Sequence, residues 1–345
     1  MNNTQETNGT LPSVIETDMI IVGAGPCGLF TVFEAGLLKM RCHLIDALPT
    51  PGGQLSEIYP KKPIYDIPGY PEILAQDLVE NLMKQIEPFE PTFTLGERAE
   101  KLVKTQDGFQ MTTNRGTVVR GKVVVIAGGL GSFEPRKPNL ERLVEFEDRG
   151  VDYIIKDPEK FRDKRVVIAG GGDSALDWTI YLANIAREVT LVHRRTEFRG
   201  ALESVEKVHH LATTGGIRLI TQAQITTLDG DASLRQVTVL TDGGEEKIEV
   251  DYLIPLFGLS PQLGPIGEWG LEIERNALKV NTMDYSTNVP GIYAVGDINI
   301  YPGKLKLILC GFHEAAIMCQ FAFNKVYPDK KPSFKYTTVV GVQGF

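Results

Sequence analysis

Apolar and polar positions near the start of the chain predict a strand, a helix and a second strand in quick succession. An apolar run covers about 18–22, a pattern with helical period covers about 28–39, and another apolar run covers 42–46. The glycine-rich sequence Gly23-Ala-Gly25-Pro-Cys-Gly28 lies between the first strand and the helix. Together these elements predict a βαβ unit of about 30 residues.

The same pattern recurs in the middle of the chain. An apolar run at 165–169 leads into Gly170-Gly-Gly172-Asp173-Ser174-Ala175, and a helix over about 174–186 and a strand over 188–193 follow. One such turn is a weak signal, but two at this separation predict a protein that holds two nucleotides at once. We therefore expect an α/β fold with two Rossmann-like dinucleotide-binding domains.

The stretches outside the two units suggest where the domains divide, because 345 residues are many for one hydrophobic core. A Pro/Gly-rich loop at 49–71, a helix over 76–89 and a strand over 122–127 follow the first unit. A charged connector at 131–165 precedes the second unit, and a helix over about 311–324 comes late. The predicted division is a disordered tail at 1–17, one domain at 18–130 and 259–345, and a second domain, inserted into the first, at 131–258.

Composition and charge exclude several classes of protein. With 42% hydrophobic and 23% charged residues, the chain has the composition of a globular domain. The formal charge of −8 argues against general nucleic-acid binding. No apolar run reaches the roughly 18 residues of a membrane span, and 1–17 lack a signal-peptide core, so we expect a cytoplasmic protein without a membrane partner. The cysteines lack C-x-x-C spacing, which supports neither a metal site nor a dithiol; they are Cys27, Cys42, Cys310 and Cys319.

Each glycine of the first turn has a physical task. Gly23 allows the tight turn, Gly25 lets the backbone approach a pyrophosphate, and Gly28 permits close packing of the helix on the strand. The helix N-terminus then presents N–H groups and a positive dipole end to phosphate. Asp46 ends the next strand, where a carboxylate accepts hydrogen bonds from ribose hydroxyls. The turn predicts a dinucleotide site and leaves the identity of the dinucleotide open.

The second turn has basic residues where the first has an acid. His193 is followed by Arg194 and Arg195, and Arg199 comes four residues later. Guanidinium groups bind a 2′-phosphate bidentately, whereas an acid would repel it, so these arginines favour NADPH over NADH. The glycines and Ser174 would approach the pyrophosphate, while Asp173 is less suited to phosphate and suited to capping the helix.

A late segment identifies the first nucleotide through a resemblance. Thr287-Asn-Val-Pro-Gly-Ile-Tyr-Ala-Val-Gly296-Asp297 resembles the segment by which the two-dinucleotide-domain flavoprotein reductases supply an aspartate to the flavin ribitol. The resemblance covers 18–345 and implies that FAD occupies the first site, with Asp297 as the ribitol partner. It implies the fold of thioredoxin reductase, in which the NADPH-binding domain is inserted into the FAD-binding domain.

The chain departs from thioredoxin reductase at the redox disulfide. Where that enzyme carries C-x-x-C, before the second glycine turn, this chain has Ile154 and Asp157, which cannot exchange thiols. The stretch 51–69 and the pattern Arg194-Arg195-x-x-Phe198-Arg199 instead resemble the thioredoxin-reductase-like class of bacterial ferredoxin–NADP+ reductases. By that resemblance Tyr59 stacks on one flavin face and Tyr336 covers the other. The further FAD contacts that it implies are Cys27, Gln54, Ala99, Phe133 and Thr338.

The implied function is electron transfer by a homodimer between NADPH and ferredoxin or flavodoxin. The flavin carries the chemistry, so no catalytic residue and no metal are expected. His313 lies near the start of the late helix, and two interpretations of it stay open: it tunes the flavin, or it has a structural role alone. Two alternatives remain open: an NADPH-dependent flavoprotein reductase or oxidase acting on a small acceptor such as a quinone or oxygen, and a sensor without turnover. Candidate docking cations for an acidic ferredoxin are Lys61, Lys62, Arg136, Lys137, Lys304, Lys306, Lys330 and Lys331.

Overall fold

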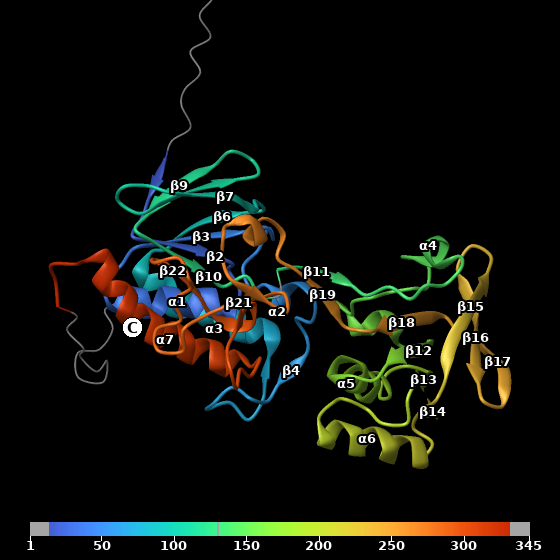
Figure 1. Cartoon of the computed structure of the whole chain (residues 1–345). Coiled ribbons are helices and arrows are strands. Elements are labelled where there is room, and N and C mark those ends of the chain that lie inside the picture. The colour runs from blue at the N-terminus through green and yellow to red at the C-terminus, as the bar shows by residue number, and fades with distance from the viewer. Residues whose placement is uncertain (1–13, 130, 332–345) are drawn as a thin grey trace, which may run out of the picture. The chain divides into compact units, whose positions relative to one another are not determined.

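The computed structural model describes residues 14–129 and 131–331, without the side chains of 132–134 and 259–261. The chain divides into two compact units. Unit 1 comprises Met1–Ser132 and Gln262–Phe345, and unit 2 comprises Phe133–Pro261. Unit 1 is therefore made from both ends of the chain, as the blue and red ribbons of Figure 1 show.

Unit 1 is built on a five-stranded parallel sheet with the order β22-β10-β2-β3-β6. Its strands are β2 (Met19–Val22), β3 (Cys42–Asp46), β6 (Thr92–Leu95), β10 (Val123–Ile126) and β22 (Ile292–Ala294). All residues of β2 and β10 are buried, because both faces of the sheet are covered. In a parallel sheet the carboxyl ends of the strands meet at one edge, so the turns after β2, β3, β10 and β22 gather there.

Two layers cover this sheet. Helices α1 (Pro26–Leu37), α3 (Ala75–Ile86) and α7 (Ile308–Val326) pack on one face, where they share a core with Met19 and Ile21. A second sheet packs on the other face, where Ile20 and Val22 point (Figure 1). Its order is β1-β9-β8-β7, from Ile15–Glu16, Val118–Gly121, Phe109–Thr113 and Ala99–Lys104.

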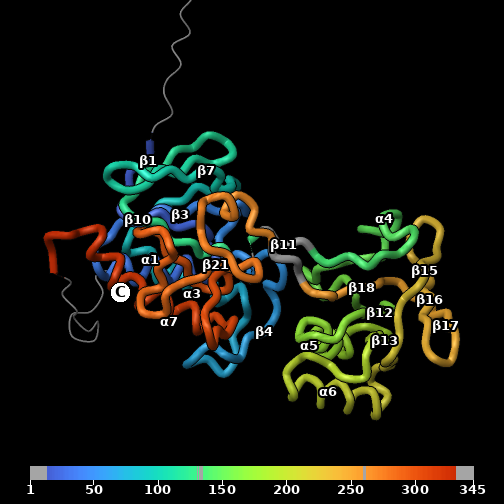
Figure 2. The backbone as a smooth tube through the Cα atoms, viewed as in Figure 1, coloured from blue at the N-terminus to red at the C-terminus, as the bar shows by residue number. Residues whose placement is uncertain are grey.

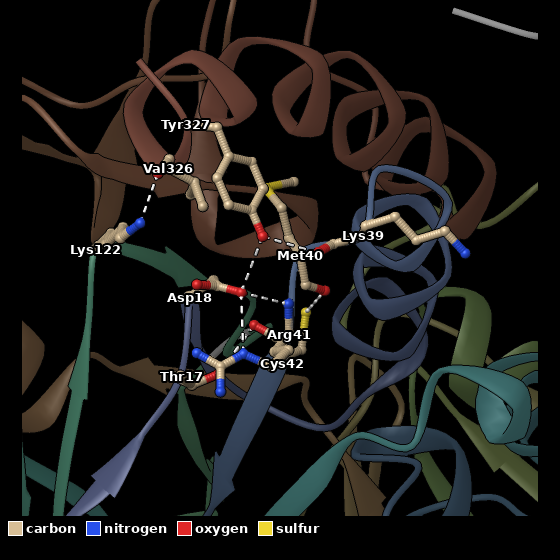
Figure 3. A network of polar contacts seen from close by, with 9 residues as sticks. All are labelled: Thr17, Asp18, Lys39, Met40, Arg41, Cys42, Lys122, Val326 and Tyr327. Atoms are coloured by element: carbon tan, nitrogen blue, oxygen red, sulfur yellow. Dashed lines mark hydrogen bonds and ion pairs between the residues drawn. The ribbon is translucent and has the colours of Figure 1, made fainter. Parts of the chain in front are cut away.

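Polar contacts fix the end of α7 to the starts of β2 and β3, as Figure 3 shows. The Tyr327 hydroxyl lies 3.3 Å from Asp18 Oδ2, which also accepts the backbone N–H of Arg41 at 2.9 Å. Lys122 donates from Nζ to the carbonyl oxygen of Val326 at 2.8 Å, which satisfies a carbonyl at the helix end. These contacts hold the C-terminal end of α7 at the edge of the main sheet where β2 and β3 begin.

Short elements complete unit 1. They are α2 (Gln54–Glu57), β4 (Pro63–Ile64), β5 (Ile73–Leu74), η1 (Glu87–Phe89), η3 (Gly264–Glu268), β20 (Ile273–Glu274), β21 (Ala277–Lys279), η4 (Gly296–Ile298) and β23 (Asn299–Ile300). The η4 turn directly follows β22, so the sequence that carries Asp297 lies at the carboxyl edge of the main sheet.

Unit 2 repeats the plan on a smaller scale. Its four-stranded parallel sheet has the order β14-β13-β12-β18, from Arg218–Ile220, Glu188–Val192, Arg165–Gly170 and Tyr252–Leu256. Helix α5 (Asp173–Leu182) connects β12 to β13, and α6 (Leu202–Thr213) connects β13 to β14. An antiparallel sheet of β15 (Gln224–Gly230), β16 (Leu234–Thr241) and β17 (Gly244–Glu249) shares a core with Val167 and Val192.

The chain passes between the units through β11 (Ser132–Pro135) and β19 (Leu259–Gln262), which pair with each other. Figure 2 traces the backbone of unit 1, which is made from the blue and red ends of the chain, and that of unit 2. The predicted connector at 131–165 extends well beyond it and is part of unit 2, because Phe146 of α4 (Leu143–Phe146) and Phe161 of η2 (Pro158–Phe161) are buried. The sequence analysis had already included this connector in the second domain, at 131–258, without predicting its buried aromatic residues.

Two further predictions need correction. Ile15 and Glu16, placed in the disordered tail, form β1, because their backbone pairs with β9 in register Ile15 to Val119. The late helix begins at Ile308 rather than near Gly311, so His313 lies in its second turn, at an exposed position. Within 14–129 and 131–331, no helix has the length and apolar character needed to cross a membrane.

Candidate dinucleotide-binding sites

The first glycine turn joins β2 to α1, and two of its glycines are required by backbone packing. Gly23 has φ +109°, and a Cβ there would lie 2.5 Å from the carbonyl oxygen of Ala127. A Cβ on Gly28 would lie 2.0 Å from the carbonyl oxygen of Gly23. Gly25 is different, because the nearest atom to its Cβ would be 3.9 Å away. The turn therefore leaves an open cradle at Gly25, where α1 begins without a side-chain cap.

Asp46 ties this turn to the end of β3. Its Oδ2 accepts the backbone N–H of Ala24 at 2.6 Å, and its Oδ1 accepts that of Leu48 at 2.9 Å. Burial raises the pKa of Asp46, and the two backbone hydrogen bonds oppose that rise. Each carboxylate oxygen has a second lone pair, so the group retains capacity for the ribose hydroxyls that the sequence predicts.

The Pro/Gly-rich loop folds against the same turn. The N–H of Gly52 donates to the carbonyl oxygen of Ala24 at 2.8 Å. Gly53, at φ +58°, precedes α2, and its Cβ would lie 3.1 Å from the Cα of Gly25. Gln54 begins α2, and its Nε2 lies 3.3 Å from where a Cβ of Gly129 would be. The fold thus brings Gln54 to the carboxyl edge of the sheet, beside the residues after β10.

Tyr59 and Asp297 share one electrostatic environment. Burial raises the pKa of Tyr59 to about 12, and the negative charge of Asp297 adds to that rise. Burial also raises the pKa of Asp297, while the ammonium groups of Lys306 and Lys304 lower it. The structure therefore places the predicted flavin-stacking ring and the predicted ribitol partner close enough to interact.

Cys27 links the glycine turn to the elements after β22. A Cβ on Gly296 would lie 2.9 Å from Cys27 Sγ, and one on Gly311 would lie 2.2 Å from it. The thiol therefore fills a notch between η4 and the start of α7. Burial raises the pKa of Cys27 to about 12, so the group is a neutral packing thiol at physiological pH.

The most highly connected polar group of this region was missed by the sequence analysis. Glu314 of α7 is fully buried, and its Oε2 accepts the N–H of Gly296 at 2.7 Å and Asn299 Nδ2 at 2.8 Å. Its Oε1 accepts the Tyr301 hydroxyl at 2.8 Å and pairs with Lys304 Nζ. We call these five residues the Glu314 cluster. An acid on a helix stripe otherwise formed by small and apolar residues was the available signal.

This cluster corrects one predicted docking cation. The Lys304 side chain is only 5% exposed and is paired with Glu314, so it is not a surface cation. Lys306, two residues later, is exposed. Of the remaining predicted FAD contacts, Ala99 is buried at the start of β7. The Phe133 side chain and the predicted contacts Tyr336 and Thr338 lie outside the described parts of the chain.

The second glycine turn joins β12 to α5 and has the same division of tasks. A Cβ on Gly170 would lie 2.6 Å from the carbonyl oxygen of Leu256, whereas one on Gly172 would have no atom within 4 Å. Gly172 is the N-cap of α5, and Ser174 is exposed in the first turn of that helix. Asp173 does not cap its own helix, because its Oδ1 accepts the N–H of Ala201, at the start of α6, at 2.8 Å. The open space at Gly172 corresponds to that at Gly25.

The basic segment after β13 folds back over this turn. Arg194 and Arg195 are exposed and line a shallow pocket with Thr196, Glu197, Gln222 and Asp242. Arg199 is absent from that lining, and its backbone N–H donates to the carbonyl oxygen of Gly171 at 2.8 Å. The structure therefore brings two of the three predicted arginines to one pocket and uses the backbone of the third to hold the loop.

His193 is the second residue that sequence reasoning did not assign. Its ring lies against Gly171, whose Cβ would come within 2.1 Å of it. The ring stacks on Phe198 with centroids 4.9 Å apart, and its Nε2 lies 3.0 Å from the carbonyl oxygen of Glu197. A carbonyl only accepts, so Nε2 carries the proton. His193 therefore braces the arginine loop against the glycine turn.

No disulfide forms among the cysteines, all four of which lie in the described part of the chain and are free. Ile154 and Asp157 belong to unit 2, where Asp157 is the N-cap of η2. Within the same described residues, no group of His, Cys, Asp and Glu is arranged to hold a metal ion.

Comparisons with known proteins agree with this architecture. A family model described as pyridine nucleotide-disulphide oxidoreductase matches residues 17–315. The "Ferredoxin--NADP reductase 2" of Christiangramia forsetii is 68% identical over 337 residues, which cover 96% of this chain and 95% of that protein. The "Ferredoxin--NADP reductase" of Flavobacterium johnsoniae is 65% identical over 334 residues, with 96% and 95% coverage.

A solved structure confirms the predicted fold class. The thioredoxin reductase of T. acidophilum superposes with a TM-score of 0.78 at 24% identity, covering 90% of this chain and 98% of that chain. At this identity the likeness concerns the fold alone. Two Rossmann-like units, the second inserted into the first, are what the sequence predicted.

Proposed function

This chain belongs to the pyridine nucleotide-disulphide oxidoreductase family, and we propose that it is a ferredoxin–NADP+ reductase, which uses FAD to move electrons between NADPH and ferredoxin or flavodoxin. The observation that carries the proposal is similarity, over nearly the whole chain, to proteins named for this activity. The chain's own residues support the same conclusion at both glycine turns and at the position of the missing disulfide.

The first site suits FAD. The open cradle at Gly25 admits a pyrophosphate to the start of α1, and Asp46 stands at the end of the neighbouring strand for a ribose. At the other side of the turn, Asp297 and Tyr59 lie near one another in partly buried positions. We assign the ribityl chain to Asp297 and the isoalloxazine ring to Tyr59 and Gln54. When bound, FAD supplies the means to take up a hydride and to release electrons one at a time.

The residues of the first site hold and orient the flavin. Tyr59 is a neutral phenol at physiological pH, and burial raises its pKa further, to about 12, so it offers an uncharged aromatic face. Cys27 fills the space between η4 and α7 without adding charge. The flavin carries the chemistry, so we assign no residue a catalytic role in the strict sense.

The second site suits NADPH. Arg194 and Arg195 line one pocket and are exposed, which allows their guanidinium groups to clamp a 2′-phosphate. Gly172 leaves open space at the start of α5 for the pyrophosphate. His193 and the backbone of Arg199 hold the arginine loop on the glycine turn, so the two phosphate-binding parts keep a fixed spacing.

We propose that the acceptor is a separate protein that takes electrons directly from the flavin, because the cysteines form no disulfide that could receive them. Exposed cations offer docking surface for an acidic ferredoxin, and Lys306, Lys330 and Lys331 are among them. We further propose a homodimer, for which the exposed apolar side chains of Leu305 and Leu309 offer contact surface. Free cysteines throughout are typical of a reducing compartment, which favours the cytoplasm.

The decisive experiment compares NADPH-dependent reduction of cytochrome c with and without added ferredoxin. We expect ferredoxin to raise the rate at low ionic strength and added salt to reduce that gain, because charge pairing steers association. A rate that ferredoxin does not raise would contradict the proposal and favour the alternative, a reductase or oxidase of quinones or oxygen. Rapid bleaching of the flavin by NADPH would reject a sensor without turnover.

A further inference from the structure

In the Glu314 cluster the two oxygens of one carboxylate bond to two different segments of the chain. Oε2 holds the residues on either side of the Asp297 turn, accepting from Gly296 N–H at 2.7 Å and from Asn299 Nδ2 at 2.8 Å. Asn299 Nδ2 also donates to the carbonyl oxygen of Ala294, at 2.9 Å, where β22 ends. Oε1 holds the following segment through Tyr301 and Lys304. The turn that carries Asp297 is therefore fixed at both flanks by a single oxygen atom.

We propose that Glu314 is a positioning residue for FAD, which acts by holding η4 so that the Asp297 carboxylate faces the ribityl chain. This inference rests on the proposed assignment of FAD to the first site. Lys304 has a separate task, because its ammonium group compensates the buried negative charge. Oε2 orients the turn by accepting its hydrogen bonds, and the ion pair with Lys304 offsets the free-energy cost of burying the carboxylate.

The geometry favours positioning over a purely structural tie. A carboxylate has about four lone-pair sites, and each of the four is met by a donor from 296–304. None of these donors comes from the main sheet or from α1. The bonds thus restrain the turn and the segment after it, while the packing of α7 on α1 depends on buried apolar residues such as Ala315 and Met318.

Two double variants separate the clamp from the charge. K304M/E314Q removes both charges and keeps an amide oxygen that accepts from Gly296 and Asn299, while its NH2 group donates to the Tyr301 hydroxyl. K304M/E314L removes both charges and the acceptor as well. Since a buried ion pair is often replaced by apolar residues at little cost, both proteins are expected to fold. They differ mainly in whether η4 is held.

The measurement is the rate at which FAD leaves the purified holoenzyme, followed by the rise in flavin fluorescence after dilution. We expect K304M/E314Q to stay within about twofold of the parent, and K304M/E314L to lose FAD about tenfold faster, because hydrogen bonds to the turn are lost. The same two variants are then made with D297N. In that background we expect the difference between them to vanish, since Glu314 acts through Asp297.

Equal FAD loss from the two variants would overturn the proposal, and so would a difference that persists with D297N. Should K304M/E314L fail to fold, N299S breaks one flank of the clamp and is compared with and without D297N in the same way. E34Q, at a half-buried glutamate of α1, is the matched control and should leave FAD loss unchanged. The outcome is independent of the proposed function: a protein that retains FAD but does not reduce ferredoxin refutes only the function, and one purified without FAD refutes the site.

Discussion

The two glycine turns begin alike and are closed by opposite chemistry. Backbone packing requires Gly23 and Gly28 in the first turn and Gly170 in the second, whereas Gly25 and Gly172 leave open space at a helix start. Over the first turn the chain places a carboxylate, Asp46, bonded to the turn itself. Over the second it places an arginine loop, bonded to the turn through the backbone of Arg199.

The difference shows how one backbone plan serves two nucleotides. The glycine turn and the helix start provide for a pyrophosphate, which both dinucleotides share. In the assignment proposed above, the residues at the end of the second strand of each βαβ unit distinguish the two nucleotides, because that position meets the adenosine ribose. An acid there accepts from free hydroxyls, and guanidinium groups bind a 2′-phosphate. The aspartate near the second turn, Asp173, is turned away to the start of α6 instead.

The largest effect is expected where the two kinds of glycine are exchanged for alanine. G28A forces a Cβ to within 2.0 Å of a backbone oxygen, so we expect the free energy of unfolding to fall by about 3 kcal/mol. G25A changes that quantity by about 1 kcal/mol at most, but it weakens FAD binding about tenfold because the methyl group enters the open cradle. Urea unfolding of the apoproteins and FAD titration measure the two quantities; a G28A protein as stable as G25A would contradict this division of tasks.

The arginine loop is tested by R194A/R195A. We expect KM for NADPH to rise about 100-fold, because two charge-assisted contacts to the 2′-phosphate are lost. KM for NADH should change by less than about threefold, since NADH lacks that phosphate. Steady-state kinetics with both nucleotides give the comparison, with R235A, at an exposed arginine of β16, as the control. Equal losses for the two nucleotides would mean that the loop does not select NADPH.

The smallest expected effects come from replacing Asp46 and Asp173, the two aspartates beside the turns. D46A leaves the N–H groups of Ala24 and Leu48 without their acceptor in a half-buried place, and we expect it to cost about 2 kcal/mol of unfolding free energy. D173A removes one exposed bond to Ala201 and should cost about 1 kcal/mol or less. Only D173A should raise KM for NADPH, because it frees the arginine loop. The reverse pattern, measured by unfolding and kinetics, would show that the two acids have exchanged roles.

The βαβ units were predictable from sequence because their signals are local. Strands β2 and β12 are largely apolar runs, Gly23 and Gly170 have contacts that exclude a Cβ, and the helices start within a few residues of where the pattern places them. The arginines after β13 were equally visible, since their charge and their distance from the turn are properties of the linear chain. The family resemblance added Asp297 and Tyr59, which no local rule connects to Gly25.

Tertiary structure alone decided the roles of Glu314, Lys304 and His193. Lys304 was expected at the surface as a docking cation, and only the fold shows it buried against Glu314, ten residues away. His193, which follows β13, packs against Gly171, which follows the adjacent strand β12. Each of these roles depends on partners brought together by packing: an acid within an apolar helix stripe marks Glu314 in the sequence, but its hydrogen-bond partners are identified only by the fold. The sequence by itself determined two dinucleotide-binding turns and, through its arginines and its family resemblance, indicated NADPH and FAD, because these signals lie in the linear chain; the fold decided which residues hold the sites in shape.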